Sequence, residues 1–178
     1  MFGVSGEQSV SLMHQCISGL RDLRDVLEEV LPRIGFNGRA DDFIRYWFGK
    51  DSRLNAEVIR LVEDLRTSGA ADLYIATGQE HHRAKYLWNN LGLSKCFDGM
   101  FYSADIGLPK TNVRFFEAIN RRLGIAAAER PIFFDDQAMI VDLARAVGWD
   151  ATPYTSARDV VEHPRLLALW SFSQTDSR

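Results

Sequence analysis

Residues 74–110 read YIATGQEHHRAKYLWNNLGLSKCFDGMFYSADIGLPK, and they alternate short apolar runs with a helical spacing of apolar residues. A short apolar run at 73–76 comes first, and another follows at 100–102. Between them, apolar side chains recur every three or four residues until Gly92, at Ala84, Leu87, Trp88 and Leu91. Because this spacing places apolar side chains on one helix face, we predict the order strand, helix, strand.

The same alternation continues toward the carboxyl terminus. It predicts, in order, a helix that ends before Gly124, a strand at 131–134, a helix over 140–147, a strand at 151–154 and a helix that Ser156 caps with Asp159. Short, continuous apolar strands separated by amphipathic helices are typical of a parallel sheet covered on both faces. We therefore predict an α/β fold with three layers, of the Rossmann-like type.

Upstream residues follow a helical pattern. Leu20, Leu23, Leu27 and Leu31 form one apolar stripe, and an aromatic segment follows at 43–48. We predict that residues 9–67 form a helical cap, within which these aromatic side chains pack. Residues 1–8 and 68–178 would then form the sheet domain.

Composition narrows the class of protein. The chain has 178 residues, a net charge of −3 and 46% hydrophobic residues, which suits one globular domain with a cap. A nucleic-acid partner is not expected, because no stripe of Lys and Arg is present. Cys16 and Cys96 lie too far apart for a zinc motif and indicate no disulfide framework. The sequence contains no apolar run of about 18 residues and no signal-peptide pattern, so we predict a cytoplasmic protein without a membrane partner.

Polar side chains follow three of the predicted strands. Thr77 and Gly78 follow the first strand, Lys110 lies in the loop after the second, and Asp135 with Asp136 follow the third. Parallel strands bring ligands to their carboxyl ends, so we expect these side chains to converge. Mg²⁺ commonly takes one or two carboxylates together with water and phosphate oxygens. A hydroxyl, free N–H groups of the next helix and an ammonium suit the phosphate itself.

Residues 74–110 and the later stretch IFFDDQAMIVDLARAVGW, 132–149, together resemble motifs two, three and four of the haloacid dehalogenase-like (HAD) hydrolase superfamily. The similarity extends from about residue 54 to residue 156, and is greatest with members that carry a small helical cap. It implies that Thr77 binds the transferred phosphoryl group, with Gly78 beside it, and that Lys110 is the motif-three lysine. It also implies that Asp135 and Asp136 hold Mg²⁺, and we expect Asp136 to reach the metal more directly because adjacent strand residues point to opposite faces.

The first motif of this superfamily departs from its usual form. The motif carries an Asp nucleophile and an Asp acid/base, two residues apart at the end of a central strand. In the start of this chain, MFGVSGEQ, the matching positions are Gly3 and Ser5, and neither has a carboxylate. The resemblance therefore implies that the first motif is either missing or degenerate, and that turnover is impaired. We further predict that Met1–Ser5 forms the short strand between the strands that bear motifs two and four.

The functional hypothesis is a phosphatase-type HAD relative that acts, with Mg²⁺, on a small phosphorylated metabolite and is impaired by loss of its nucleophile. One alternative is a non-catalytic binding or regulatory protein on the same fold. A weaker alternative is a haloacid dehalogenase, which would need the same missing Asp and no magnesium.

Structural explanations compete at each candidate residue. Thr77 with Glu80 matches a helix capping box, Lys110 suits a solvated turn, and the acidic pair could cap the next helix. The four histidines are expected at the surface, since neighbouring helix positions such as His81 and His82 point in different directions.

Overall fold

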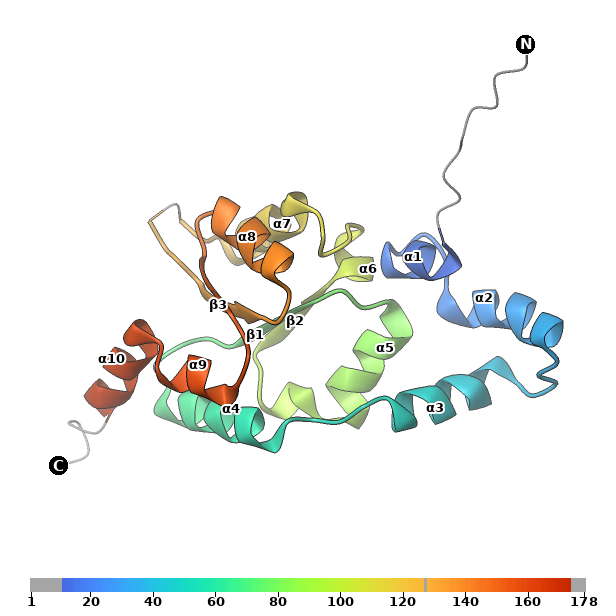
Figure 1. Ribbon diagram of the computed structural model, residues 1–178, viewed down its shortest axis with the longest axis horizontal. Coiled ribbons are helices and arrows are strands. Elements are labelled where there is room, and N and C mark those ends of the chain that lie inside the picture. Colours follow the sequence, from blue (N-terminus) through green and yellow to red (C-terminus); the bar gives the residue numbers. More distant parts are fainter. Residues whose placement is uncertain (1–10, 127, 174–178) are drawn as a thin grey trace, which may run out of the picture.

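The computed structural model describes residues 11–126 and 128–173 of the chain. Four short strands lie in the middle of the molecule, with helices on both sides (Figure 1). The strands are β1 (Tyr74–Thr77), β2 (Gly99–Tyr102), β3 (Ile132–Asp135) and β4 (Asp150–Pro153). Each lies within one residue of its predicted position, so the alternation of strands and helices is confirmed.

The strands form two parallel pairs. β1 pairs with β2 from Tyr74↔Gly99 to Thr77↔Tyr102, and β3 pairs with β4 up to Asp135↔Pro153. In the part of the chain that the structure describes, β1 and β3 are not hydrogen-bonded to each other, so each pair is a separate two-stranded sheet. The predicted strand 1–5 lies outside the described residues, and its place between β1 and β3 stays a prediction.

Helices form the outer layers of this arrangement, as an α/β fold requires. Those of the sheet region are α4 (Ala56–Ser68), α5 (His81–Lys85), α6 (Ser103–Ile106), α7 (Val113–Leu123), α8 (Ala138–Ala146), α9 (Ala157–Val161) and α10 (Pro164–Ser173). A π-helical turn, Tyr86–Asn90, and a 3-10 turn, Leu93–Lys95, extend from α5. Figure 1 shows α7 and α8 on one side of the strands and α4 with α9 on the other.

The main core lies between the strands and the layer of α7 and α8. Phe116 of α7 is fully buried, and its ring contacts those of Phe133 and Trp149 at centroid distances of 5.7 and 5.2 Å. Ala76 of β1 and Phe101 of β2 pack against the same cluster as Phe133 of β3. The two strand pairs therefore share one apolar core although they share no hydrogen-bonded ladder.

A second core holds the amino-terminal helices together. These are α1 (Leu12–Ile17), α2 (Leu23–Val30), the 3-10 turn Leu31–Ile34 and α3 (Ala40–Lys50). Cys16 and Phe48 are buried in this cluster, with Phe43 and Trp47 packed against it, which confirms the predicted packing of the aromatic segment. Tyr46 is exposed instead. Because α4 contacts α9 and α10, residues 56–68 lie with the sheet region, and the predicted cap boundary at residue 67 stays a prediction.

One close approach joins the amino-terminal helices to the sheet region. Gly19 follows α1 with φ of +72°, and a Cβ there would lie 2.5 Å from the carbonyl oxygen of Ala104 in α6. Only glycine fits this backbone conformation at this distance. The contact places α1 beside α6, at the end of β2.

Cys16 and Cys96 are both buried, and within the described residues neither forms a disulfide. Among residues 11–126 and 128–173, none of the helices has the length and apolarity required to span a membrane.

Candidate active site

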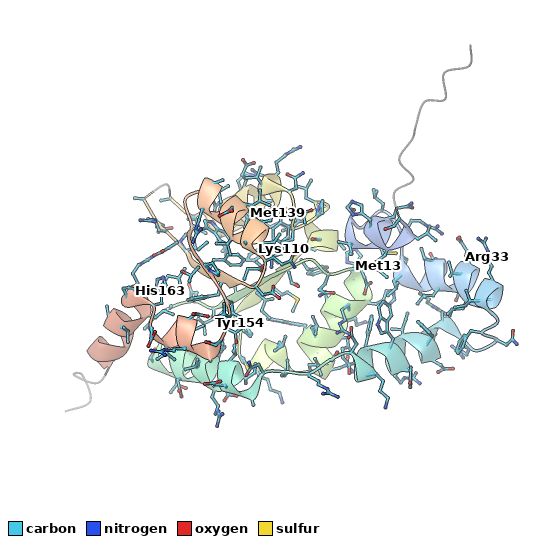
Figure 2. The ribbon with its side chains drawn as sticks, in the orientation of Figure 1. Met13, Arg33, Lys110, Met139, Tyr154 and His163 are labelled. Carbon is cyan, nitrogen blue, oxygen red and sulfur yellow. The ribbon has the colours of Figure 1, made fainter. Side chains whose placement is uncertain are left out.

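Lys110 and Asp135 form an ion pair at the carboxyl end of the strands. The Lys110 Nζ lies 2.5 Å from Oδ2 of Asp135, the last residue of β3. The two side chains are only 16% and 9% exposed, so water screens the pair weakly. Lys110 lies near the middle of the molecule, in the loop between α6 and α7 (Figure 2). The structure thus brings together two residues that are 25 positions apart in the sequence.

The end of β1 lies against the same loop. A Cβ on Gly78 would be 3.7 Å from the Cβ of Lys110, in ordinary van der Waals contact. Thr77 is the last residue of β1 and directly precedes this contact. Gly78 and Asp135, at the ends of two strands, therefore both lie close to Lys110 in the loop between α6 and α7.

The two consecutive aspartates have different surroundings. Asp135 is bound on both oxygens, since its Oδ1 accepts a hydrogen bond from the Gln137 N–H at 3.0 Å while Oδ2 meets Lys110. Asp136 is exposed, and within the described part of the chain it has no ion-pair partner. Asp136 is thus the carboxylate that is available to a ligand, and its role as a metal ligand stays a prediction.

The donor set limits the kind of metal site that fits here. Nowhere in residues 11–126 and 128–173 do three His, Cys, Asp or Glu side chains gather closely enough to hold an ion. Mg²⁺ needs only one or two carboxylates when water and phosphate oxygens complete its shell. Asp136 therefore fits a magnesium ion shared with a bound phosphate, and the described residues do not fit a self-contained metal centre.

The helix after β1 begins differently from the prediction. Glu80, only 4% exposed, is the N-cap of α5, and its carboxylate accepts hydrogen bonds from the backbone N–H groups of His82 and Arg83. The capping box led by Thr77 is therefore wrong, and these two N–H groups are occupied rather than free for phosphate. Burial raises the pKa of Glu80, although the two backbone hydrogen bonds act in the opposite direction.

The histidines occupy three kinds of environment. His82 Nε2 lies 3.0 Å from both carboxylate oxygens of Asp22, so it joins α5 to the start of α2. His81 Nδ1 lies 3.2 Å from the Tyr102 hydroxyl at the end of β2. His163 was predicted at the surface, and this is wrong, because the residue is 7% exposed.

His163, which lies between α9 and α10, is buried against residues of β3 and β4. Its ring lies edge-on to Phe134 at a centroid distance of 5.6 Å, and its Nε2 lies 3.7 Å from Asp150. Burial acts to raise the pKa of Asp150, but the hydrogen bond from Arg165, together with the charge of His163, lowers it below its usual value.

Sequence reasoning missed Ser103, the first residue of α6. The side chain is fully buried, and its Oγ accepts a hydrogen bond from the backbone N–H of Lys110 at 2.9 Å. The available signal was a polar residue directly after the apolar run 100–102, seven positions before Lys110.

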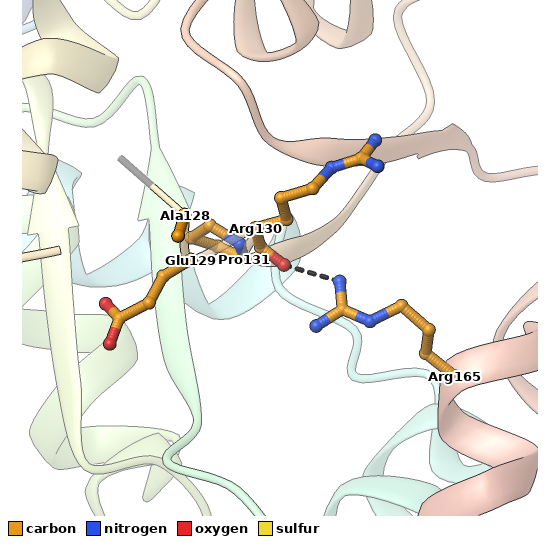
Figure 3. A pocket seen from close by; sticks show the side chains of 5 residues that line it. All are labelled: Ala128, Glu129, Arg130, Pro131 and Arg165. Carbon is orange, nitrogen blue, oxygen red and sulfur yellow. Dashed lines mark hydrogen bonds between the residues drawn. The ribbon is translucent and has the colours of Figure 1, made fainter. Parts of the chain in front are cut away.

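A hollow of about 570 Å³ lies at the opposite end of β3 (Figure 3). Its lining includes Arg130 and Pro131, just before β3, and Arg165, whose guanidinium donates a hydrogen bond to the Arg130 carbonyl. Ligands of parallel α/β proteins bind at the carboxyl ends of the strands, and this hollow lies at an amino end. It is therefore separate from the site at Lys110.

The fold and the site together define an α/β protein with a polar site at the carboxyl ends of parallel strands. The family model described as haloacid dehalogenase-like hydrolase matches residues 11–148, and the chain belongs to that family. No curated protein matches the chain.

Solved structures of HAD proteins share the fold. A HAD family enzyme from Bacteroides thetaiotaomicron, in a magnesium complex, has a TM-score of 0.72 and 15% identity, over 91% of this chain and 82% of that one. The same wild-type enzyme in complex with magnesium and inorganic phosphate has a TM-score of 0.68 and 16% identity, over 80% and 73%. A predicted HAD-like family hydrolase from Porphyromonas gingivalis has a TM-score of 0.68 and 18% identity, over 93% and 80%.

The positions expected to replace the nucleophile and the acid/base, Gly3 and Ser5, lie outside the described residues. Their alignment with the first motif stays a prediction.

Proposed function

We propose that this chain is a phosphatase-type HAD-like hydrolase that binds a small phosphorylated molecule together with Mg²⁺, and that its turnover is impaired. The observation that carries the proposal is the ion pair between Lys110 and Asp135 beside Gly78, with Asp136 left open to a ligand. The impairment rests on Gly3 and Ser5, which stand where a carboxylate nucleophile and a carboxylate acid/base are expected.

Charge explains why phosphate and metal would bind together. Two carboxylates and one ammonium give the site a net charge of −1, so a phosphate alone would be repelled. Asp136 would hold a divalent cation, and the positive charge of that cation would offset the negative charge of the two carboxylates and of the phosphate. A HAD family enzyme of similar fold was crystallised with magnesium and inorganic phosphate, which supports this choice of ligands.

Each residue then has a separate task. The Lys110 ammonium would offset negative charge on the phosphoryl oxygens, and the Thr77 hydroxyl would donate a hydrogen bond to one of them. Asp135 would keep the ammonium in place through the ion pair. Without a carboxylate at position 3, no covalent phosphoryl intermediate would form, and the chain would bind phosphate better than it turns over an ester.

The test compares the natural chain with a Gly3→Asp/Ser5→Asp variant in an assay of a chromogenic phosphate ester with Mg²⁺. We expect negligible turnover in the natural chain and a gain of at least about 10²-fold in the double variant, the scale of one restored acid/base group. Adding Lys110→Met to the double variant is the matched control and should abolish the gain. Robust turnover by the natural chain would overturn the proposed impairment.

Binding is measured separately from turnover. Inorganic phosphate with Mg²⁺ should raise the melting temperature of the natural chain, because a ligand at 100 times its Kd stabilises the folded state by about 2.7 kcal/mol. Phosphate without Mg²⁺ should give a smaller shift. If neither combination stabilises the natural chain or the double variant, the phosphate pocket is refuted.

The second candidate is a non-catalytic binding or regulatory protein. It rests on Gly3 and Ser5, which lack the expected carboxylates, while Lys110 and Asp135 keep the ion pair that could hold a ligand without turnover. Phosphate binding without any turnover in the Gly3→Asp/Ser5→Asp variant would support it over an impaired enzyme.

A further inference from the structure

Ser103 is a polar residue in a place where polar groups are costly. Its side chain is fully buried, at the junction of β2 and α6. Buried polar groups are retained when they make hydrogen bonds. The partner here is the backbone N–H of Lys110, which donates to the Ser103 Oγ at 2.9 Å.

The backbone around Ser103 ties the same loop down further. The Ser103 carbonyl accepts hydrogen bonds from the N–H groups of Gly107 at 2.9 Å and Leu108 at 3.2 Å. The loop that leads to Lys110 is thus folded back on Ser103 at three points. The third of these hydrogen bonds, which the Ser103 Oγ accepts, comes from the backbone N–H of Lys110 itself.

Ser103 also faces the end of β1. A Cβ on Gly78 would be 3.9 Å from the Ser103 Oγ, and the next residue, Ala104, donates its N–H to the Gln79 carbonyl at 3.2 Å. The Ser103 side chain therefore lies close both to the end of β1 and to the loop that carries Lys110.

We propose that Ser103 is a positioning residue, whose hydroxyl holds the backbone of Lys110 so that the ammonium reaches Asp135 and the β1 end. The inference rests on the proposed function only where it concerns phosphate. Loss of the hydroxyl leaves the Lys110 N–H without its buried acceptor, so the loop would shift and the ammonium would spend more time away from Asp135.

The first test reads the lysine itself. The chain has four lysines, so acetylation rates measured by mass spectrometry can compare Lys110 with Lys50, Lys85 and Lys95. In the natural chain Lys110 should react most slowly, because it is paired and mostly buried. Ser103→Ala should speed its acetylation at least about threefold relative to the other lysines, while Ser103→Thr, which keeps the hydroxyl, should restore slow labelling.

Ser52→Ala is the matched control. The Ser52 Oγ is also buried, and it has no hydrogen-bond partner within the described residues. This variant removes a buried hydroxyl without touching Lys110, so the relative labelling of Lys110 should stay unchanged.

The outcomes separate the two proposals. Unchanged Lys110 labelling in Ser103→Ala, or an equal rise at all four lysines that Ser103→Thr fails to reverse, overturns the positioning role. Faster Lys110 labelling in a chain that binds no inorganic phosphate keeps the positioning role and refutes the proposed function instead. If the natural chain binds phosphate with Mg²⁺, Ser103→Ala should weaken the Kd about tenfold, and an unchanged Kd would overturn the link to the site.

Discussion

Replacement of Lys110 by methionine should lower the free energy of unfolding by about 3 kcal/mol. The variant keeps an apolar side chain at this position but removes the ammonium, which pairs with Asp135 and lies 5.4 Å from the centroid of the Phe133 ring. A carboxylate that is 9% exposed then loses its charged partner, and breaking a buried pair from one side costs about 3–5 kcal/mol. We expect a loss at the lower end of this energy range, because Oδ1 of Asp135 keeps the hydrogen bond that it accepts from the Gln137 N–H.

A double-mutant cycle isolates the pair. Lys110→Met, Asp135→Asn and the combined variant should show a coupling energy of about 1–3 kcal/mol, because each change alone leaves the other partner unpaired. The matched control is the ion pair of Arg45 and Asp42, whose side chains are 76% and 56% exposed. Exposed pairs of this kind contribute about 0.5 kcal/mol or less.

Urea unfolding followed by tryptophan fluorescence measures each variant, with the midpoint and slope compared so that changes in the unfolded state are recognised. A loss below about 0.5 kcal/mol in Lys110→Met, equal to that of the exposed control, would refute the reasoning. Lys110 would then be an ordinary solvated lysine in a turn and not a residue of a binding site.

Three further predictions concern the core, a turn and a buried carboxylate. Phe116→Ala should cost about 3–5 kcal/mol in urea unfolding, because the ring is fully buried, whereas Tyr46→Ala should cost about 0.5 kcal/mol or less. Gly19→Ala should lower the melting temperature more than Gly35→Ala. Both glycines have positive φ, but of these two only Gly19 would place a Cβ against a carbonyl oxygen. Equal decreases in melting temperature would contradict this prediction. Burial raises the pKa of Glu80 in the folded protein above its unfolded value, which is near 4.5. The contribution of Glu80 to the free energy of unfolding is therefore greatest below the unfolded pKa, and it is lost as the pH rises through the folded pKa. Glu80→Gln should therefore gain stability relative to the natural chain between pH 4 and pH 7, and a flat difference would disprove the shift.

Much of the secondary structure was predictable because its signals are local. Asn55 caps α4 by accepting N–H bonds from residues two and three positions on, and Gly69 ends the helix in the left-handed conformation. Ser156 and Asp159 cap α9 in the same short-range way. Such contacts span at most four residues, so they can be recognised from spacing alone.

The approximate location of the site was also predictable. Parallel strands that alternate with helices all end at one edge. Gly78 and Asp135 at strand ends, and Lys110 in the loop that follows a strand, were therefore expected to converge. The contacts of Lys110 with Asp135 and with the β1 end agree with this expectation. The topology predicts that these residues converge, because their convergence depends on the order of strands and helices and not on how the side chains pack.

The spacing of residues in the sequence could not show which side chains form pairs and which are buried. Asp135, not Asp136, meets Lys110, and Ser103 reaches the lysine loop from inside the core. His163 is buried because Phe134 and Asp150, far away in the sequence, pack around it. These choices depend on contacts between distant segments, whose burial and hydrogen bonding are set by how the layers pack, and no local pattern of residues encodes that packing.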